Sequence, residues 1–439
     1  MLGAVSAGGK GERDRAPPGF ATSPKGWLDY RTFMPNVIFV APYFLETTLR
    51  FVDAAAGLPG VRLGLVSTDP EGRLPPGLRS RLAAHWRVDD CLDPAQIVWA
   101  MDSLAGRLGK IDRAIATLEE LQVPLAEARR ALELPGMSVE AARNFREKSR
   151  MKSIFDSAHV PCARHRLAST GDDLHAFARE VGYPLVVKPP AGAGARNTFR
   201  VDDDARLSQL IAADPPSSAD PTLVEEFIVG DEHSFDSVCI GGKLEWYSIS
   251  RYFPTPLHVL ENPWIQWCVL LPRDISGPEY HGIRDAGARA LKALGMETGL
   301  SHMEWFRRRD ASIAISEVAA RPPGAQFTTL ISYAHDLDLY KAWARLMVFD
   351  EFDVPARRWA VGIAFLRGQG RGRVTAIHGV DRVAPELGPI TVEVKLPREG
   401  ASPTGTYEGD GYVMVRHPDT EVVEQALAKI VSNVRVELG

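Results

Sequence analysis

The sequence predicts a multidomain protein of mixed α/β and α+β class. Its 439 residues allow two to four domains with sizeable cores. Short apolar runs alternate with helix-like segments between residues 35 and 132, an order typical of βαβ units and a parallel sheet. Later strand-like runs are joined by Gly-rich turns and interspersed with helices. We expect a mostly disordered tail at 1–34, an N-terminal domain at 35–140, a core of two α+β subdomains at 141–228 and 229–355, and a small α+β domain at 356–439.

Composition excludes several classes of partner. The net charge of −5 gives no electrostatic argument for binding nucleic acid or an anionic membrane. No apolar run approaches the roughly 18 residues that a membrane span needs, and the tail lacks the apolar segment of a secretory signal. The four cysteines are far apart and form no CxxC pair, which favours reduced thiols. We expect a cytoplasmic protein with small-molecule partners, and a homodimer is left open.

The region 35–140 is expected to form a small Rossmann-like domain. Strands are expected at 36–43, 61–67 and 112–118, and helices up to residue 56, near 94–108 and at 123–132. The first strand is followed by APYFLET rather than GxGxxG, which argues against a dinucleotide site. Glu119 directly follows the third strand, at the end where open sheets place ligands. It is a candidate for contacting a substrate; the alternatives are a solvated residue or a helix cap.

Two lysines in the next region point to a phosphate site. The helical spacing of Met151, Ile154 and Phe155 places Lys148 on or just before a helix. Lys188 ends an apolar strand, where a lysine is rare unless its charge has a partner. The small-residue loop behind it, Ala191–Ala195, would let backbone N–H groups approach an anion. This pattern is neither a P-loop nor a protein kinase, so we expect a different nucleotide-binding fold.

The strand TLVEEFI, at 222–228, is a candidate for binding a flat heterocycle. Its end would present backbone groups, with Phe227 and Ile228 as apolar walls. Glu232 follows the turn at Gly230 and could accept hydrogen bonds from a sugar. The alternative interpretation is an ordinary edge strand.

Two glutamates on the run Ser301–Phe327 indicate a metal site. If the run is a β-hairpin with its loop at Asp310–Ala311, Glu304 lies opposite Glu317, with Cβ atoms roughly 5 Å apart. Such carboxylates repel unless a cation lies between them, and Mg²⁺ binds through one or two carboxylates plus phosphate oxygens. Arg321 follows closely and could hold a phosphoryl group. The alternative is a solvated face neutralised by Arg321.

These motifs, in this order, resemble the ATP-grasp superfamily and, within it, carboxylate–amine ligases such as the bacterial L-amino acid ligases. HMEW…SEVAAR resembles the family's E…E-x-N-x-R, while REKSRMK and YPLVVKPPAGAGA resemble its two lysine-bearing segments. VEEFIVGDE resembles its nucleotide hinge. The resemblance runs from about Pro35 to the end of the chain. It implies an ATP-grasp core, in which 141–228 carries the lid and 229–355 carries the metal and phosphate residues.

The resemblance also implies roles for individual residues. Lys148 and Lys188 would hold the α- and β-phosphates of ATP, and the loop containing Ala193, Gly194 and Ala195 would close over them. The hinge for adenine and ribose would consist of Glu225, Phe227, Ile228 and Glu232.

For the metal and the phosphoryl group, the resemblance implies Glu304 and Glu317 as ligands of Mg²⁺ (or Mn²⁺) and Arg321 as the group that stabilises the phosphoryl in transfer. The chain has Ala319 where the family has an asparagine ligand, so the number of metal ions is left open.

The implied function is an ATP-dependent ligase that phosphorylates a carboxylate to an acylphosphate and couples it to an amine. An amino acid or small peptide is the expected substrate, with Arg251 as a candidate for its carboxylate and Glu119 for its amino group. The alternatives are an ATP-grasp carboxylase using bicarbonate and a non-catalytic nucleotide-binding module.

Overall fold

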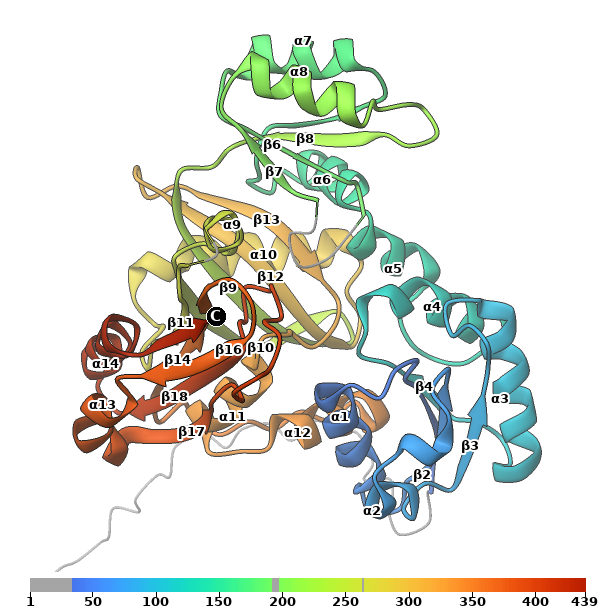
Figure 1. Cartoon of the computed structure of the whole chain (residues 1–439). Coiled ribbons are helices and arrows are strands. Elements are labelled where there is room, and N and C mark those ends of the chain that lie inside the picture. The colour runs from blue at the N-terminus through green and yellow to red at the C-terminus, as the bar shows by residue number, and fades with distance from the viewer. Residues whose placement is uncertain (1–33, 192–196, 263) are drawn as a thin grey trace, which may run out of the picture.

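The structure is a computed structural model that describes residues 34–191, 197–262 and 264–439. Within these ranges it confirms the mixed class, because four sheets are accompanied by helices on their faces. Three parts can be told apart in Figure 1. Residues 148–226, here called the lid unit, stand at the top, and residues 36–146, the N-terminal unit, lie at the lower right. Residues 360–438, the C-terminal elements, lie at the lower left. The expected tail up to residue 33 and the loop residues Ala193, Gly194 and Ala195 lie outside the described residues.

The N-terminal unit is built on a parallel sheet with strand order β3-β2-β1-β4. Its central strand is buried on both faces: Val37 and Phe39 pack towards α1, and Ile38 and Val40 pack towards α3. The strand β3 was not expected, because its residues AHWR form no apolar run and pairing with β2 makes them a strand. The elements are β1 (Asn36–Val40), α1 (Glu46–Ala56), β2 (Arg62–Ser67), η1 (Glu71–Arg73), α2 (Pro76–Arg79), β3 (Ala84–Arg87), α3 (Pro94–Leu108), β4 (Arg113–Ile115), η2 (Glu119–Leu121), α4 (Gln122–Ala131) and α5 (Val139–Arg146).

The lid unit is an antiparallel sheet of order β5-β8-β6-β7 with α7 and α8 on one face. The start of α7 is fixed by a capping box, in which the Thr170 hydroxyl accepts from the Asp173 amide and the Asp173 carboxylate accepts from the Thr170 amide. The elements are α6 (Lys148–Ser157), β5 (His165–Ala168), α7 (Gly171–Val181), β6 (Leu185–Lys188), β7 (Phe199–Val201), α8 (Asp204–Ala213) and β8 (Thr222–Glu226).

An antiparallel sheet of order β13-β12-β9-β10-β11-β14-β18-β17 forms the centre of the molecule. Because β11 pairs with β14, this sheet continues from the region 229–355 into the region 356–439. Its first elements are β9 (Gly230–Ile240), β10 (Lys243–Phe253), α9 (Pro256–Glu261), β11 (Trp267–Leu271), η3 (Pro278–Tyr280), α10 (His281–Leu294), β12 (Gly299–Arg308), β13 (Ile313–Ala319), α11 (Phe327–His335) and α12 (Leu339–Phe349).

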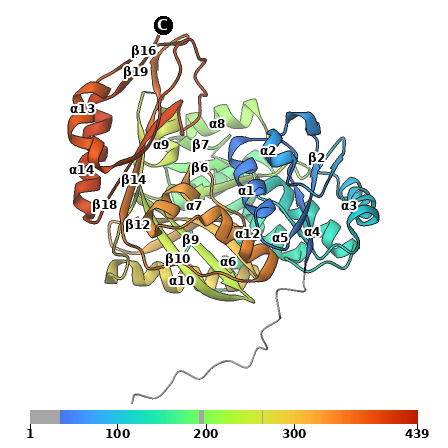
Figure 2. The same cartoon turned by 90° about the horizontal axis from the view of Figure 1, so that it is seen from below.

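The C-terminal elements add strands and two helices at the far end of this sheet (Figure 2). The last helix, α14, buries Val423, Ala426, Leu427 and Ile430, which recur at the spacing of one helix face. The elements are β14 (Ala360–Leu366), β15 (Gly368–Gly370), β16 (Val374–His378), α13 (Val380–Leu387), η4 (Gly388–Ile390), β17 (Thr391–Lys395), β18 (Gly411–His417), α14 (Thr420–Asn433) and β19 (Arg435–Leu438).

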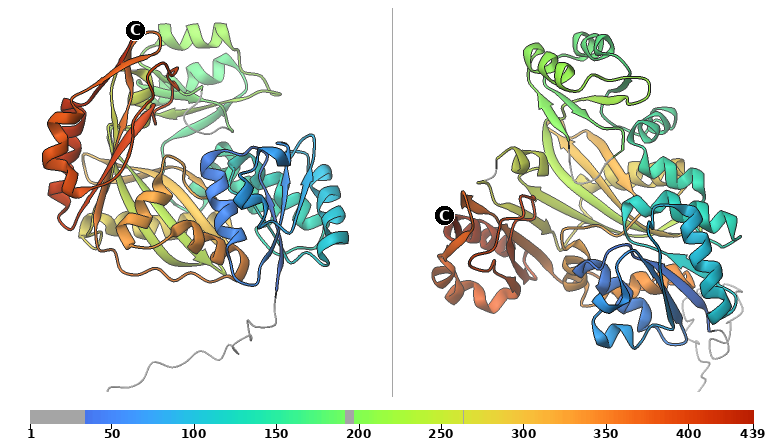
Figure 3. Two further views of the ribbon diagram at one scale, coloured as in Figure 1. Left: turned by 60° about the horizontal axis from the view of Figure 1, so that its bottom comes forward. Right: turned by 45° about the vertical axis from the view of Figure 1, so that its right-hand side comes forward.

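The two faces of the central sheet differ in character. Phe235, Met303 and Trp305 belong to an apolar core formed with α5, α6 and α10. Successive strand residues point to opposite faces, so their neighbours Glu232, His302 and Glu304 lie on the other face, towards a cavity. Figure 3 shows the N-terminal unit and the C-terminal elements on different sides of the central sheet. No described helix has the length and apolar character needed to cross a membrane.

The hairpin of β12 and β13 has the expected pairing of Glu304 with Glu317, but the loop differs from the expected one. The Arg308 amide bonds to the Ser312 carbonyl, so three residues form the loop, and Ala311 has a left-handed φ of 65°. This shifts the pairing by one residue near the loop. A bulge between Glu304 and Trp305 then restores the register. The expected two-residue loop was therefore wrong, and the bulge compensates for it.

Candidate active site

A cavity of about 510 Å³ lies where the lid unit, the central sheet and the N-terminal unit meet. Helix α1 and the segment after β4 contribute Phe51 and Glu119, β8 contributes Glu225, and β12 and β13 contribute the two hairpin glutamates. Ten of the expected site residues line it: Glu119, Lys148, Lys188, Glu225, Phe227, Ile228, Glu232, Glu304, Glu317 and Arg321.

Arg251 is not brought into this cavity. It lies on β10 next to Tyr252, which does line the cavity, so the alternation of strand side chains turns Arg251 to the opposite face. There its guanidinium donates to the Tyr280 hydroxyl at 2.8 Å and pairs with Glu424 at 3.1 Å. We therefore withdraw Arg251 as the group that would bind a substrate carboxylate.

Three carboxylates share the sheet side of the cavity and differ in their surroundings. Glu317 pairs with the Lys148 ammonium at 2.9 Å. Burial by itself would raise the pKa of Glu317, but Lys148, Lys188 and Arg321 outweigh it and lower the pKa to about 2.

The pKa of Glu232 is shifted in the opposite direction. Its burial raises the pKa well above the ordinary value, and the negative charges of Glu304 and Glu317 raise it further. Glu304 and Glu317 face each other across the hairpin, and neighbouring carboxylates of this kind are ligands that a hard divalent cation takes. Both hairpin glutamates keep about a quarter of their side-chain surface exposed, 25% for Glu304 and 28% for Glu317, so their oxygens remain reachable.

Two lysines share one buried carboxylate under the lid. Glu225 pairs with Lys188 at 3.0 Å and with Lys152 at 3.5 Å, and the Lys152 side chain is fully buried. Burial favours the neutral acid, but the two ammonium groups lower the pKa of Glu225 overall. Lys152 was given no role in the sequence analysis, although it lies in the motif REKSRMK. Its position four residues after Lys148, on the same helix face, was the signal that could have identified it.

Arg321 is held by the N-terminal unit. Both its Nε and a terminal nitrogen donate to one Glu119 carboxylate oxygen, at 3.1 and 2.8 Å, while the other oxygen accepts from Arg146 at 3.2 Å. Glu119 is therefore a partner of two guanidinium groups. Its position in the cavity agrees with its expected place at a strand end, and its contacts are the side chains of Arg321 and Arg146.

His302 is a site residue that sequence reasoning missed. Its Nδ1 contacts the Asp236 carboxylate at 2.6 Å, and its Nε2 faces Glu304 at 3.7 Å. Burial alone would lower the pKa of His302, but Asp236 and Glu304 raise it to about 9. His302 also pairs across the strands with Ala319, the position where the family's asparagine is absent. The signal available in the sequence was its position two residues before Glu304, on the same strand face.

The segment between β8 and β9, which was expected to be the nucleotide hinge, borders the cavity. Phe227 and Ile228 line the cavity, and the Arg200 guanidinium lies over the Phe227 ring at 4.6 Å. The end of β9 is close to the hairpin: a Cβ at Gly230 would lie 2.2 Å from the Arg307 carbonyl oxygen, so only glycine fits there. This close approach brings Glu232 beside Phe306, opposite it in the β9–β12 pairing.

Comparisons with known proteins identify a domain family within the chain. Residues 153–334 match the family model of the ATP-grasp domain. An L-arginine-specific L-amino acid ligase of Bacillus subtilis is 23% identical over 61% of this chain and 66% of its own length. An alanine–anticapsin ligase of Bacillus subtilis is 26% identical over 62% of this chain and 61% of its own. The chain thus spans about two thirds of the length of these relatives.

The crystal structure of an L-amino acid ligase from Bacillus licheniformis aligns with a TM-score of 0.74 and 19% sequence identity. It covers 92% of this chain and 99% of that structure, so the likeness of fold extends well beyond the matched domain. The chain therefore contains an ATP-grasp domain at residues 153–334, which confirms the resemblance found in the sequence.

Proposed function

We propose that this protein is an ATP-dependent ligase that joins a carboxylate to an amine, with an amino acid or small peptide as substrate. The observation that carries this proposal is the facing pair Glu304 and Glu317, in one cavity with Lys148, Lys188 and Arg321. The two named ligases from Bacillus subtilis support amino acid chemistry. The carboxylase and the non-catalytic module have no observation here that favours them.

The reaction would proceed in two steps. A substrate carboxylate oxygen attacks the γ-phosphorus of ATP, the bond to the ADP oxygen breaks, and an acylphosphate forms. The amine then attacks the acyl carbon, loses a proton, and displaces phosphate. The first step needs alignment and positive charge around the phosphoryl oxygens more than it needs covalent help. The cavity supplies cationic groups for this purpose.

The donor set fits Mg²⁺, or Mn²⁺ as an alternative, because it consists of paired carboxylates with reachable oxygens. Glu304 and Glu317 would hold the ion, which when bound neutralises and orients phosphate oxygens. Lys148 and Lys188 now face Glu317 and Glu225, and we expect them to contact the α- and β-phosphates. Arg321 would contact the transferring phosphoryl group, with Glu119 keeping its guanidinium in place.

The part of the cavity nearest the N-terminal unit offers space for the acceptor. Phe51, Phe327 and Tyr340 form an apolar wall there, and Thr48 and Gln326 add polar groups. An acylphosphate hydrolyses readily, so an apolar wall that limits water would favour attack by the amine. We propose that this wall, rather than Arg251, contributes to the choice of substrate.

The test measures phosphate release from ATP and Mg²⁺, with and without pooled amino acids, in the wild type and in Glu317→Ala. We expect release that depends on amino acids and is absent in the variant. Arg251→Ala is a matched control, because that residue lies outside the cavity, and it should keep the activity. Release that depends on bicarbonate instead would favour the carboxylase, and equal release in the Glu317→Ala variant would contradict the proposed site.

A further inference from the structure

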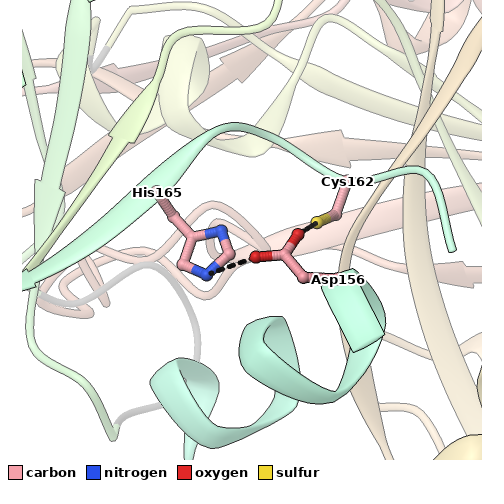
Figure 4. Close-up of side chains that lie close together, drawn as sticks. All are labelled: Asp156, Cys162 and His165. Carbon is pink, nitrogen blue, oxygen red and sulfur yellow. Dashed lines mark hydrogen bonds and ion pairs between the residues drawn. The ribbon is translucent and has the colours of Figure 1, made fainter. Parts of the chain in front are cut away.

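Three side chains with different metal-ligating atoms converge on the side of the lid unit where α6 meets β5 (Figure 4). They are the carboxylate of Asp156, the thiol of Cys162 and the imidazole of His165, and their ligand atoms all lie within 4.8 Å of one another. None of them lines the cavity described above. The group is therefore distinct from the carboxylates at Glu304 and Glu317.

Two of the three ligand pairs are spaced almost as in a tetrahedral metal site, and the third pair, Cys162 Sγ and His165 Nε2, lies within 4.8 Å. One Asp156 oxygen is 3.6 Å from His165 Nε2, and the other is 3.8 Å from Cys162 Sγ. Ligand bonds of about 2.0–2.3 Å in tetrahedral geometry place neighbouring ligand atoms about 3.3–3.6 Å apart. Small side-chain rotations would close the difference, and Asp156 is free to make them because its side chain is 66% exposed.

The imidazole of His165 is oriented as a metal ligand. Its Nδ1 lies 3.1 Å from the Ala163 carbonyl oxygen, which can only accept, so Nδ1 carries the proton in that contact. In the neutral form of the ring, Nε2 then carries the lone pair, and this is the atom that faces Asp156. Histidines that bind metals commonly donate their other nitrogen to a carbonyl or carboxylate in this way, which fixes the tautomer and the ring.

The backbone around the thiol is also fixed. Pro161 accepts a hydrogen bond from the Ile315 amide at 2.8 Å, and Cys162 forms a bridge with Ile315 of β13. His165 begins β5 and pairs with Glu225 of β8, while Asp156 lies in the last turn of α6. The three ligands therefore come from segments whose positions are set by tertiary contacts, so the site is largely organised before a cation arrives.

We propose that Asp156, Cys162 and His165 form a binding site for one Zn²⁺-class cation, with three protein ligands and a fourth position open to water. A thiolate, an imidazole and a carboxylate together favour zinc over magnesium, because magnesium prefers oxygen ligands. Binding forms the metal–sulfur bond and releases the thiol proton to solvent. Because the thiolate rather than the thiol is the metal ligand, the affinity increases with pH.

A cation at this site would connect three parts of the nucleotide cavity. Helix α6 begins with Lys148, β5 lies beside Glu225, and the Cys162 loop is attached to β13 two residues before Glu317. Binding would thus restrain the segments that carry three of the proposed nucleotide and metal residues. The site itself does not depend on the proposed ligase activity.

The test uses cobalt as a spectroscopic substitute for zinc, on the full chain, without nucleotide and with excess Mg²⁺ to occupy the other carboxylates. We expect one equivalent of Co²⁺ to give a thiolate-to-cobalt charge-transfer band, which zinc abolishes by displacing the cobalt. In Cys162→Ser the band should be lost, and zinc affinity should fall by about 100-fold or more, since even the loss of an outer partner costs 10–100-fold.

Glu317→Gln is the matched control, because it removes a carboxylate of the other proposed metal site and should leave the cobalt band unchanged. Asp156→Asn gives a second test that keeps the thiol; we expect the band with weaker cobalt affinity. Absence of the band in the wild-type protein would overturn the proposal. Its persistence in the Cys162→Ser variant would do the same, since it would place the thiolate at Cys91, Cys239 or Cys268.

Discussion

Glu317 and Glu232 lie on one wall of one cavity, yet their environments shift their pKa values in opposite directions. The pKa of Glu317 falls to about 2, whereas that of Glu232 rises well above its ordinary value. Partial burial of Glu317 and near-complete burial of Glu232 would by themselves raise both pKa values. The difference lies in the neighbours, because Glu317 faces Lys148 at 2.9 Å, while Glu232 faces the charges of Glu304 and Glu317.

The two carboxyl groups therefore differ in how readily they take up a proton. Glu317 keeps its negative charge at neutral pH because cations surround it. Glu232 holds a proton more strongly until something positive enters the cavity or Glu304 and Glu317 are neutralised. The two residues therefore predict different results for the same conservative substitution, glutamate to glutamine.

The largest expected effect is on catalysis. Glu317→Gln should lower kcat/KM by about 1,000-fold, because it removes a charged ligand of the proposed Mg²⁺ ion. Glu232→Gln should raise KM for ATP by about 10-fold and leave kcat within a few-fold, since a glutamine can still contact a ribose hydroxyl. Steady-state kinetics with varied ATP would measure both. Equal losses in the two variants would contradict the assignment of different roles.

The next effect is on stability without nucleotide or divalent ions. Glu317→Gln should lower the free energy of unfolding by about 1–3 kcal/mol, because Lys148 loses a close anionic partner in a largely buried place. Glu232→Gln should change it by less than about 1 kcal/mol, because the amide resembles the protonated acid. Urea denaturation measures this difference, and a greater loss for Glu232→Gln would reverse the comparison.

A smaller effect on catalysis is expected at Glu119. This residue positions Arg321, one of the cations that lower the pKa of Glu317. Glu119→Gln keeps the size but removes the charge that Arg321 and Arg146 share. We expect kcat to fall by about 10-fold while KM for ATP changes little, because the orientation of Arg321 matters most in the phosphoryl transition state. Glu127→Gln, in an exposed pair with Arg143, is the control and should have wild-type kinetics.

The smallest effect is on the pH dependence of stability. The folded pKa of Glu317 is below its ordinary value of 4.5, so its contribution is present above pH 4.5 and is lost as pH falls towards 2. For Glu232 the folded pKa is raised, so its contribution is present below pH 4.5 and is lost as pH rises through that folded pKa. Each glutamine variant should flatten only its own side of the profile, by at most about 1.4 kcal/mol per pH unit.

Urea midpoints across a pH series, without divalent ions, would measure these slopes. If the stability profile of Glu232→Gln matched that of the wild type above pH 4.5, the pKa of Glu232 would not be raised in the folded protein.

The amino-acid sequence by itself determined the mixed class and the alternation of elements in the N-terminal unit, and the residues at Thr170 and along α14 have the local patterns of a capping box and a buried helix face. It also indicated the pairing of Glu304 with Glu317. These are local features, since apolar periodicity, caps and strand pairs within one hairpin depend on residues close in the chain. The hairpin loop was wrong even so, because a bulge can compensate for a loop of another length and has no clear local signal.

Only the tertiary structure decided which distant charges meet. Glu119 reaches Arg321 across 202 positions of the chain, and Asp236 reaches His302 across 66. The face on which Arg251 lies depends on strand alternation and on Tyr280 and Glu424, which the sequence does not bring together. The opposite pKa shifts of Glu317 and Glu232 have the same origin, because Coulomb interactions depend on distance in space and on the shielding that burial removes.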